Sequence, residues 1–241
     1  RLDTECIGYC FKSSNNNSRY VGLYPCLQRK FPTNKIYLKE DYYVSTSNRD
    51  AYDFIDSWPK WIKRIANIFG PSGSGKTHLV SILKNKTSVL SVKSESLNEK
   101  IFYKFKTKEV LVLENLNEKV PEKILFSLWN IALQDNKYLL ITSSRPINSY
   151  KFKLADLNSR LRSIVTIGVK LPSDDLIGVI LTKNFSDKQI KVEKKHIEYI
   201  IKRIDRSYEK ISQFILTLDK YSLKKGSPFS LKLIKEVLKM I

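Results

Sequence analysis

Residues 70–77 read GPSGSGKT and match the phosphate-binding pattern G-x-x-x-x-G-K-[ST] at every position. An apolar stretch, IANIF at 65–69, precedes the loop, and a helical pattern, KTHLVSILKN at 76–85, follows it. Glycines permit the tight backbone path, and the loop N–H groups with the helix N-terminus form a cradle for an anion. The chain must therefore place a strand, a phosphate loop and a helix in this order.

The side chains in and near this loop predict a nucleotide site that uses Mg²⁺. Lys76 would reach the β- and γ-phosphates, and the Thr77 hydroxyl would bind the metal. Glu114 ends the apolar run at 110–113, where a strand-end carboxylate can hold Mg²⁺ through its water shell. A plain Gly/Ser-rich turn and a solvated carboxylate are the alternatives. The full pattern in its required context favours ADP or ATP with Mg²⁺.

Asn115 stands where a second acid would normally follow Glu114 and prepare water for attack. An amide can hydrogen-bond to water but cannot take its proton. If the position serves as the base, its loss costs on the order of 10²–10⁴ in rate. We therefore expect a P-loop ATPase fold with weak or absent intrinsic hydrolysis.

Apolar and helix-periodic stretches alternate through the first two thirds of the chain. Strands are predicted at 65–69, 88–92, 110–115, 138–144 and 164–169, and helices at 51–61 (closed by Pro59), 76–85 and 122–136. A further short helix carries Arg160 after the fourth strand. This alternation predicts a five-stranded parallel sheet covered by helices on both faces.

After Pro172 the pattern contains helices alone, at 173–185, 193–204, 207–225 and 230–241. Ser173 is the expected N-cap of the first of them, with acids in its first turn. The predicted organisation is an N-terminal segment at 1–38 that is poorly ordered or binds a partner, an α/β P-loop core at 39–171, and a small all-helical lid domain at 172–241.

The net charge of +19 raises the question of nucleic acid, but the excess is mostly lysine scattered along the chain. Such a distribution predicts only salt-sensitive, non-specific contact with DNA. No apolar run approaches the ~20 residues of a membrane span. Cys6, Cys10 and Cys26 lie far in sequence from His78 and His196, so a zinc site is not expected, and the few thiols fit a reducing cytoplasm.

Four stretches together resemble the AAA+ ATPases of the DnaA/Hda group, and within it the shorter Hda-like (HdaA) regulators of DnaA. They are the acidic-aromatic segment at 40–61, the loop FGPSGSGKTHL at 69–79, LLITSSRP at 139–146 with LADLNSRLRS at 154–163, and the helical region at 204–238. The resemblance covers roughly residues 40–241. It implies an AAA+ core with a helical lid.

The resemblance also implies roles for particular residues. Arg160 corresponds to an arginine finger that acts in trans, although composition alone would make it one more solvated cation, and Arg162 nearby has no such support. Ser143 and Ser144 fall at the sensor 1 position, with Ser144 in place of an acid often found there. The implied nucleotide-binding residues are Gly70, Pro71, Ser72, Gly73, Ser74, Gly75, Lys76, Thr77 and His78 of the loop, and Arg206 at the sensor 2 position of the lid.

By this resemblance the chain is expected to regulate DNA replication initiation by promoting hydrolysis of DnaA-bound ATP in trans. Expected partners are DnaA and the polymerase sliding clamp, in the cytoplasm at the nucleoid or replisome, and a homodimer is compatible with this scheme. The nearest clamp-motif candidate, QRKFP at 28–32, carries charges where apolar residues should be. Two alternatives stay open: a self-sufficient ATPase of helicase-loader or DnaA-paralogue type, and a basic DNA-binding module with a vestigial nucleotide site.

Overall fold

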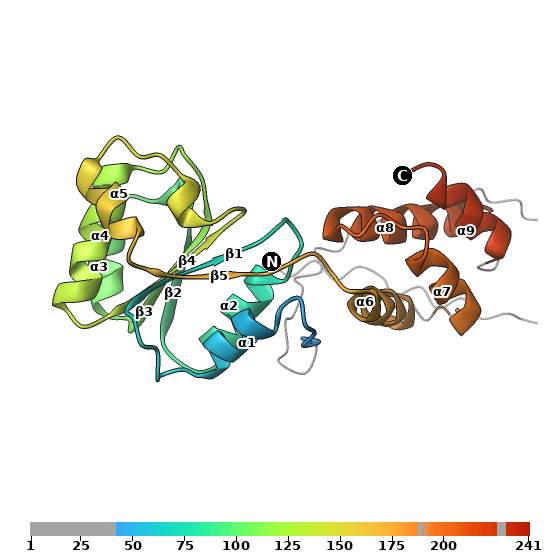
Figure 1. The fold of residues 1–241 in the computed structure, drawn as a ribbon, viewed down its shortest axis with the longest axis horizontal. Coiled ribbons are helices and arrows are strands. Elements are labelled where there is room, and N and C mark those ends of the chain that lie inside the picture. The colour runs from blue at the N-terminus through green and yellow to red at the C-terminus, as the bar shows by residue number, and fades with distance from the viewer. Residues whose placement is uncertain (1–41, 188–189, 191, 226–229) are drawn as a thin grey trace, which may run out of the picture. The chain divides into compact units, whose positions relative to one another are not determined.

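The computed structural model describes residues 42–187, 190, 192–225 and 230–241, all within one compact unit, residues 36–241. The expected N-terminal segment, with its cysteines and the QRKFP stretch, lies outside the described residues. A five-stranded sheet in the order β2-β3-β4-β1-β5 forms the core, and all four strand pairings are parallel (Figure 1). The strands are β1 Ile65–Phe69, β2 Val89–Lys93, β3 Val110–Leu116, β4 Tyr138–Ser143 and β5 Val165–Gly168. The predicted sheet is confirmed.

Helices cover both faces of this sheet, which is why its central strands are continuous apolar runs. Leu111 and Leu113 of β3 face a cluster that includes Phe105 of α3 and Leu128 of α4. The residues that alternate with them, such as Val112, face α1 and α2 instead. Figure 1 shows α3, α4 and α5 together on one side of the sheet, with α1 and α2 on the other. The core helices are α1 Arg49–Asp56, α2 Lys76–Lys84, α3 Lys100–Lys106, α4 Glu122–Gln134 and α5 Ala155–Leu161.

Two core helices differ from the sequence prediction. α1 ends at Asp56, three residues before the Pro59 that was expected to close it, because a residue before proline disfavours helical backbone and Trp58 precedes Pro59. α3 was not predicted, since it is only seven residues long and buries just Ile101 and Phe105. Two apolar positions four residues apart make too short a pattern to recognise without the sheet beneath them.

The described residues after β5 form helices joined by turns and loops, without a strand, as predicted, and have their own core. The helices are α6 Asp174–Asp187, α7 Lys194–Ile201, α8 Tyr208–Lys225 and α9 Leu231–Leu238. Phe214, Ile234 and Leu181 are among the side chains that these helices bury against one another. The Ser173 hydroxyl accepts a hydrogen bond from Leu176 N–H at 3.4 Å, which confirms Ser173 as the cap of α6. Within the described part of the chain, no helix is both long and apolar enough to cross a membrane.

A buried asparagine fixes the carboxyl ends of the two central strands. The Asn67 amide of β1 is fully buried, and its Nδ2 donates to Ile141 O at 3.0 Å and to Ser143 Oγ at 2.9 Å. Its Oδ1 accepts from Ile147 N–H at 3.0 Å. One side chain thus ties β1 to β4 and to the turn that follows β4, η3 Ile147–Ser149.

Replacing Asn67 with leucine should lower the free energy of unfolding by about 2 kcal/mol or more, because it strands buried donors and acceptors that water cannot reach. Urea unfolding followed by circular dichroism measures the change. Asn98→Ala is the matched control, since Asn98 is exposed and its described side-chain hydrogen bonds reach only Ser96 and Lys100, two residues away. Equal unfolding midpoints for the two variants would show that the Asn67 network adds nothing to stability.

Candidate nucleotide-binding site

The phosphate loop joins β1 to α2 at the carboxyl edge of the sheet, as its sequence predicts. Gly73 and Gly75 have φ of 78° and 86°, a left-handed backbone in which a side chain is strained. Space is also lacking, because a Cβ on Gly73 would lie 3.0 Å from the Tyr208 side chain and one on Gly75 would lie 3.1 Å from the Tyr42 ring. Glycine is therefore required at both positions, by the left-handed backbone and by the lack of space for a side chain.

Lys76 lies folded over its own loop. Its ammonium donates to Gly70 O at 2.7 Å and to Pro71 O at 2.8 Å, and Ser74 Oγ lies 3.4 Å away. Burial lowers the pKa of Lys76 below the usual lysine range, because a charged ammonium loses water there. A phosphate group at the loop would supply the negative charge that favours the protonated form.

Thr77 lies in the first turn of α2 and Glu114 near the carboxyl end of β3. The two side chains meet although 37 residues separate them in sequence. Thr77 Oγ1 donates to Glu114 Oε2 at 3.5 Å, and the Ser91 hydroxyl of β2 donates to Glu114 Oε1. Oxygen donors of this kind, one hydroxyl and one carboxylate beside a phosphate cradle, suit Mg²⁺, which keeps several waters. The arrangement therefore fits the metal that the sequence implies.

Replacing Glu114 with glutamine should reduce the gain in ATP affinity that Mg²⁺ provides by roughly tenfold, because an amide oxygen lacks the carboxylate's charge. Affinity measured in EDTA should stay unchanged, since the phosphate cradle itself is intact. Calorimetric titration with and without Mg²⁺ measures both quantities, and Glu109→Gln, at the amino end of β3, serves as control. An unchanged Mg²⁺ effect in Glu114→Gln would exclude Glu114 from the metal site.

Asn115 lies in a β-bulge of β3 and has the left-handed φ of 57°. Its N–H donates to Thr142 Oγ1 at 3.1 Å, and its carbonyl accepts from Ser94 Oγ at 2.7 Å. Its side chain is exposed. Asparagine and aspartate tolerate this backbone better than other residues with a side chain. The bulge thus gives Asn115 a conformational role in addition to any effect on hydrolysis.

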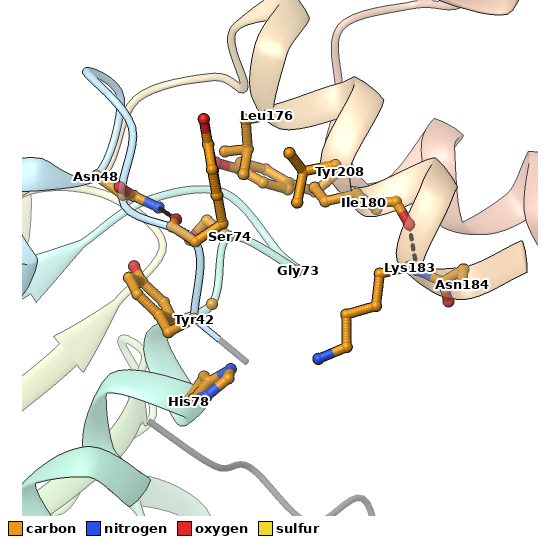
Figure 2. Close-up of a pocket in the computed structure, with 13 residues that line it drawn as sticks. Tyr42, Asn48, Gly73, Ser74, His78, Leu176, Ile180, Lys183, Asn184 and Tyr208 are labelled. Atoms are coloured by element: carbon orange, nitrogen blue, oxygen red, sulfur yellow. Dashed lines mark hydrogen bonds between the residues drawn. The ribbon is translucent and has the colours of Figure 1, made fainter. Parts of the chain in front are cut away.

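A pocket of about 170 Å³ adjoins the phosphate loop. Figure 2 shows Tyr42 and His78 on one side of it, and Tyr208, Ile180 and Lys183 on the other. The Tyr42 ring meets the His78 ring edge-on with centroids 5.0 Å apart. The pocket is smaller than the ~300 Å³ expected for a whole drug-sized ligand, so it suits one ring of a nucleotide whose phosphates lie in the loop.

Tyr42 brings an unused hydrogen-bonding group to this pocket. Its hydroxyl is buried without a hydrogen-bond partner among the described residues. Burial, followed by the nearby Tyr208, raises the pKa of Tyr42, so the hydroxyl stays neutral and can donate. Asn48 fixes the segment that carries Tyr42, because its Nδ2 donates to Tyr43 O at 2.9 Å and its Oδ1 accepts from Ser45 N–H at 2.8 Å.

Sequence reasoning did not identify Tyr42, Tyr208 or the α6 residues as lining the site. The only signal was the acidic-aromatic stretch that begins at residue 40, quoted for its resemblance. Tyr208 contacts the loop from 135 residues away and donates to Lys170 O at 3.4 Å. Such a long-range contact leaves no trace in local spacing.

The two sensor 1 residues occupy different surroundings. Ser143 is fully buried, and its hydroxyl donates to Arg145 O at 2.7 Å while it accepts from Asn67. Its backbone carbonyl accepts from Gly70 N–H at 3.1 Å, so Ser143 anchors the start of the phosphate loop to the end of β4. Ser144 is exposed, and its hydroxyl lies 3.4 Å from the Tyr150 hydroxyl. Of the two, Ser144 is the side chain open to a ligand.

Both predicted arginines contact groups other than the phosphate loop. Arg206 Nη2 lies 3.0 Å from both carboxylate oxygens of Asp174, at the start of α6. Both side chains are more than half exposed, so this ion pair contributes little to stability and can be exchanged for another anion. Arg160 of α5 donates to Asn130 Oδ1 and lies 4.6 Å from the Phe126 ring centre, both on α4. The guanidinium is thus held against α4.

No protein-family profile matches the chain. Among curated proteins, the chromosomal replication initiator protein DnaA of Campylobacter jejuni is 24% identical over 227 residues, which cover 83% of this chain and 51% of that protein. DnaA of Borreliella afzelii is 24% identical over 234 residues, 86% of this chain and 48% of that protein. The chain spans about half the length of these curated relatives.

Among solved structures, domain III of Thermotoga maritima DnaA superposes with a TM-score of 0.69 at 19% identity, covering 87% of this chain and 98% of that one. The chain has a DnaA-like AAA+ fold. AMPPCP-bound DnaA from Aquifex aeolicus matches this chain with a TM-score of 0.62 at 17% identity, over 76% of this chain and 65% of that one. The Thermotoga maritima RuvB Holliday junction branch migration motor matches with a TM-score of 0.57 at 16% identity, over 73% and 61%.

Proposed function

We propose that the DnaA-like chain is a nucleotide-binding AAA+ regulator of DNA replication initiation that promotes hydrolysis of ATP held by DnaA. The observation that supports the proposal is a phosphate-loop motif with Thr77 bonded to Glu114, next to which Asn115 replaces the acid expected of a base. Lys76, Thr77 and Glu114 lie where they can bind phosphates and Mg²⁺, whereas Asn115 follows Glu114. A nucleotide bound here is hydrolysed slowly or not at all, and it acts as a structural ligand rather than as a source of free energy.

Different groups at the site would bind different parts of ADP or ATP. The loop N–H groups and Lys76 bind the phosphates, Thr77 and Glu114 hold Mg²⁺, and the pocket beside Tyr42 and His78 accepts a ring. Arg206 can move from Asp174 to a phosphate, because its ion pair is exposed. Mg²⁺ contributes neutralisation of phosphate charge when it is bound.

The chemistry that the chain promotes takes place in the partner. The Arg160 guanidinium is held against Asn130 and Phe126 of α4, and its described contacts are with α4 rather than with the chain's own phosphate loop. A guanidinium presented in this way can stabilise the charge that develops on the γ-phosphoryl group of a neighbour's ATP. Asn115 in place of an acid then does not slow the promoted reaction, because the general base for that hydrolysis is a residue of DnaA. The work takes place in the cytoplasm at the nucleoid, with the sliding clamp as a further expected partner.

Two measurements test this proposal. The purified chain should retain ADP or ATP and turn over ATP slowly, and adding it to ATP-loaded DnaA with clamp and DNA should accelerate ADP formation. Rapid turnover by the purified chain, abolished in Glu114→Ala, would instead establish a self-sufficient ATPase of the helicase-loader type. Tight duplex binding that falls steeply with salt and survives Lys76→Ala would establish a DNA-binding module with a vestigial site.

A further inference from the structure

The amino-terminal ends of β1, β3 and β4 form an edge of the sheet that the nucleotide site does not use. Ile65 pairs with Leu139 and Val110 pairs with Tyr138, so the turns before these three strands meet at one edge. The phosphate loop follows the carboxyl end of β1, at the opposite edge (Figure 1). A ligand at the amino edge would therefore leave the nucleotide site open.

Aromatic side chains gather at this edge beside one exposed aliphatic residue. The Trp58 ring meets the Tyr138 ring edge-on with centroids 4.7 Å apart, and it meets Trp61 in the same way at 4.9 Å. Ile62 follows directly and is 94% exposed, more than any other large apolar side chain among the described residues. Trp58 is itself only partly buried, so this edge exposes part of an aromatic cluster as well as the aliphatic side chain of Ile62.

Several cations lie in the turns at this same edge. Lys137 Nζ donates to Lys106 O at 2.8 Å and to Lys108 O at 2.7 Å, which brings three lysines together. Arg64 donates to Asn136 O at 2.7 Å and lies 5.1 Å from the Tyr138 ring centre. We call these residues the amino-edge patch: Trp58, Lys60, Ile62, Lys63, Arg64, Lys106, Lys108, Lys137 and Tyr138.

The acids near the amino-edge patch cancel only part of its charge. Asp56 is paired with a different cation, Lys86, at 2.6 Å. Glu109 accepts a hydrogen bond from the Thr87 hydroxyl, and Asp135 is the third acid in these turns. The patch itself has six cations, Lys60, Lys63, Arg64, Lys106, Lys108 and Lys137. Its potential is therefore strongly positive around an apolar centre.

We propose that the amino-edge patch docks an acidic protein segment that carries an apolar side chain. The apolar side chain packs on Ile62 and Trp58, and the flanking carboxylates meet the lysines. A single-stranded nucleic acid fits less well, because bases need open aromatic faces. Ile62 is aliphatic, and the Tyr138 ring already contacts both the Arg64 guanidinium and the Trp58 ring.

Fluorescence anisotropy of a labelled, glutamate-rich peptide with one central leucine tests the proposal on the full chain. We expect saturable binding that weakens with salt, and Ile62→Glu should reduce the affinity by roughly tenfold or more. Lys63→Glu should weaken binding as well. Leu216→Glu is the matched control, because Leu216 is 66% exposed on α8, and it should bind the peptide like the unchanged chain.

The exposure of Ile62 makes the test independent of folding, because Ile62→Glu should leave the thermal unfolding midpoint unchanged. Equal peptide affinity in Ile62→Glu and Leu216→Glu would overturn the proposal. So would tighter binding of an oligo(dT) strand or of anionic phospholipid vesicles, if that binding is lost in Ile62→Glu while the peptide fails to compete. Neither outcome bears on the nucleotide site, because its phosphate loop and Glu114 lie at the carboxyl edge of the sheet.

Discussion

Replacing Arg160 with alanine is expected to reduce the acceleration of DnaA-bound ATP hydrolysis by ~10³ or more, within the ~10³–10⁵ range of arginine fingers. The expectation rests on the proposed action in trans. Alanine removes the only group that this chain would insert beside the partner's γ-phosphate. ADP formation by ATP-loaded DnaA, with clamp and DNA present, measures the effect under single-turnover conditions.

The matched control for this experiment is Arg162→Ala. Arg162 lies two residues further on, at the C-cap of α5, and is exposed. It should retain the full acceleration, whereas Arg160→Lys should lose most of it, because an ammonium cannot reproduce the planar guanidinium. Nucleotide binding by the chain itself should be the same in all three variants. Full acceleration by Arg160→Ala would remove the trans-acting finger from the proposal and leave the nucleotide site untouched.

Replacing Lys76 with alanine should weaken ADP and ATP binding by roughly 100-fold or more. The ammonium can make two charge-assisted hydrogen bonds to phosphate oxygens, each worth about 1.5–3 kcal/mol. The loop carbonyls of Gly70 and Pro71 that it now contacts offer no such interaction to an anion. Isothermal titration calorimetry on nucleotide-free protein measures the loss.

Lys84→Ala controls for charge on the same helix, because Lys84 is exposed at the end of α2. Its nucleotide affinity should remain within about twofold of the unchanged chain, as expected for a screened, distant charge. Circular dichroism of both variants checks that the fold is retained. Comparable affinities for Lys76→Ala and Lys84→Ala would show that GPSGSGKT is not a phosphate site in this chain.

The sheet and the phosphate loop could be predicted because their signals are local. A parallel strand buried on both faces is a continuous apolar run, and β3 and β4 are such runs. The loop needs glycines at fixed spacing, since Gly73 and Gly75 adopt a left-handed backbone. The N-cap at Ser173 is likewise a property of a few consecutive residues. Each feature follows from neighbours along the chain.

The surroundings of the site could not be predicted, because they arise between distant segments. Tyr208 contacts Gly73, and Arg160 contacts Asn130 and Phe126 of α4. A tyrosine in a helical segment gives no sign that its ring will meet a glycine far away. The helix α3 was missed for a related reason, since packing against the sheet supplies most of the stability of such a short helix. The ring pocket beside the loop is therefore a result of the tertiary structure alone.

The bulge at Asn115 has a genetic consequence. Because its left-handed backbone accepts asparagine and aspartate alike, exchange of one for the other requires no rearrangement of β3. The codons of these two amino acids differ by a single base. A lineage could thus gain or lose a carboxylate beside Glu114 in one mutational step, without first compensating for damage to the fold. Selection at this position would then act on the fate of the bound nucleotide and hardly at all on folding.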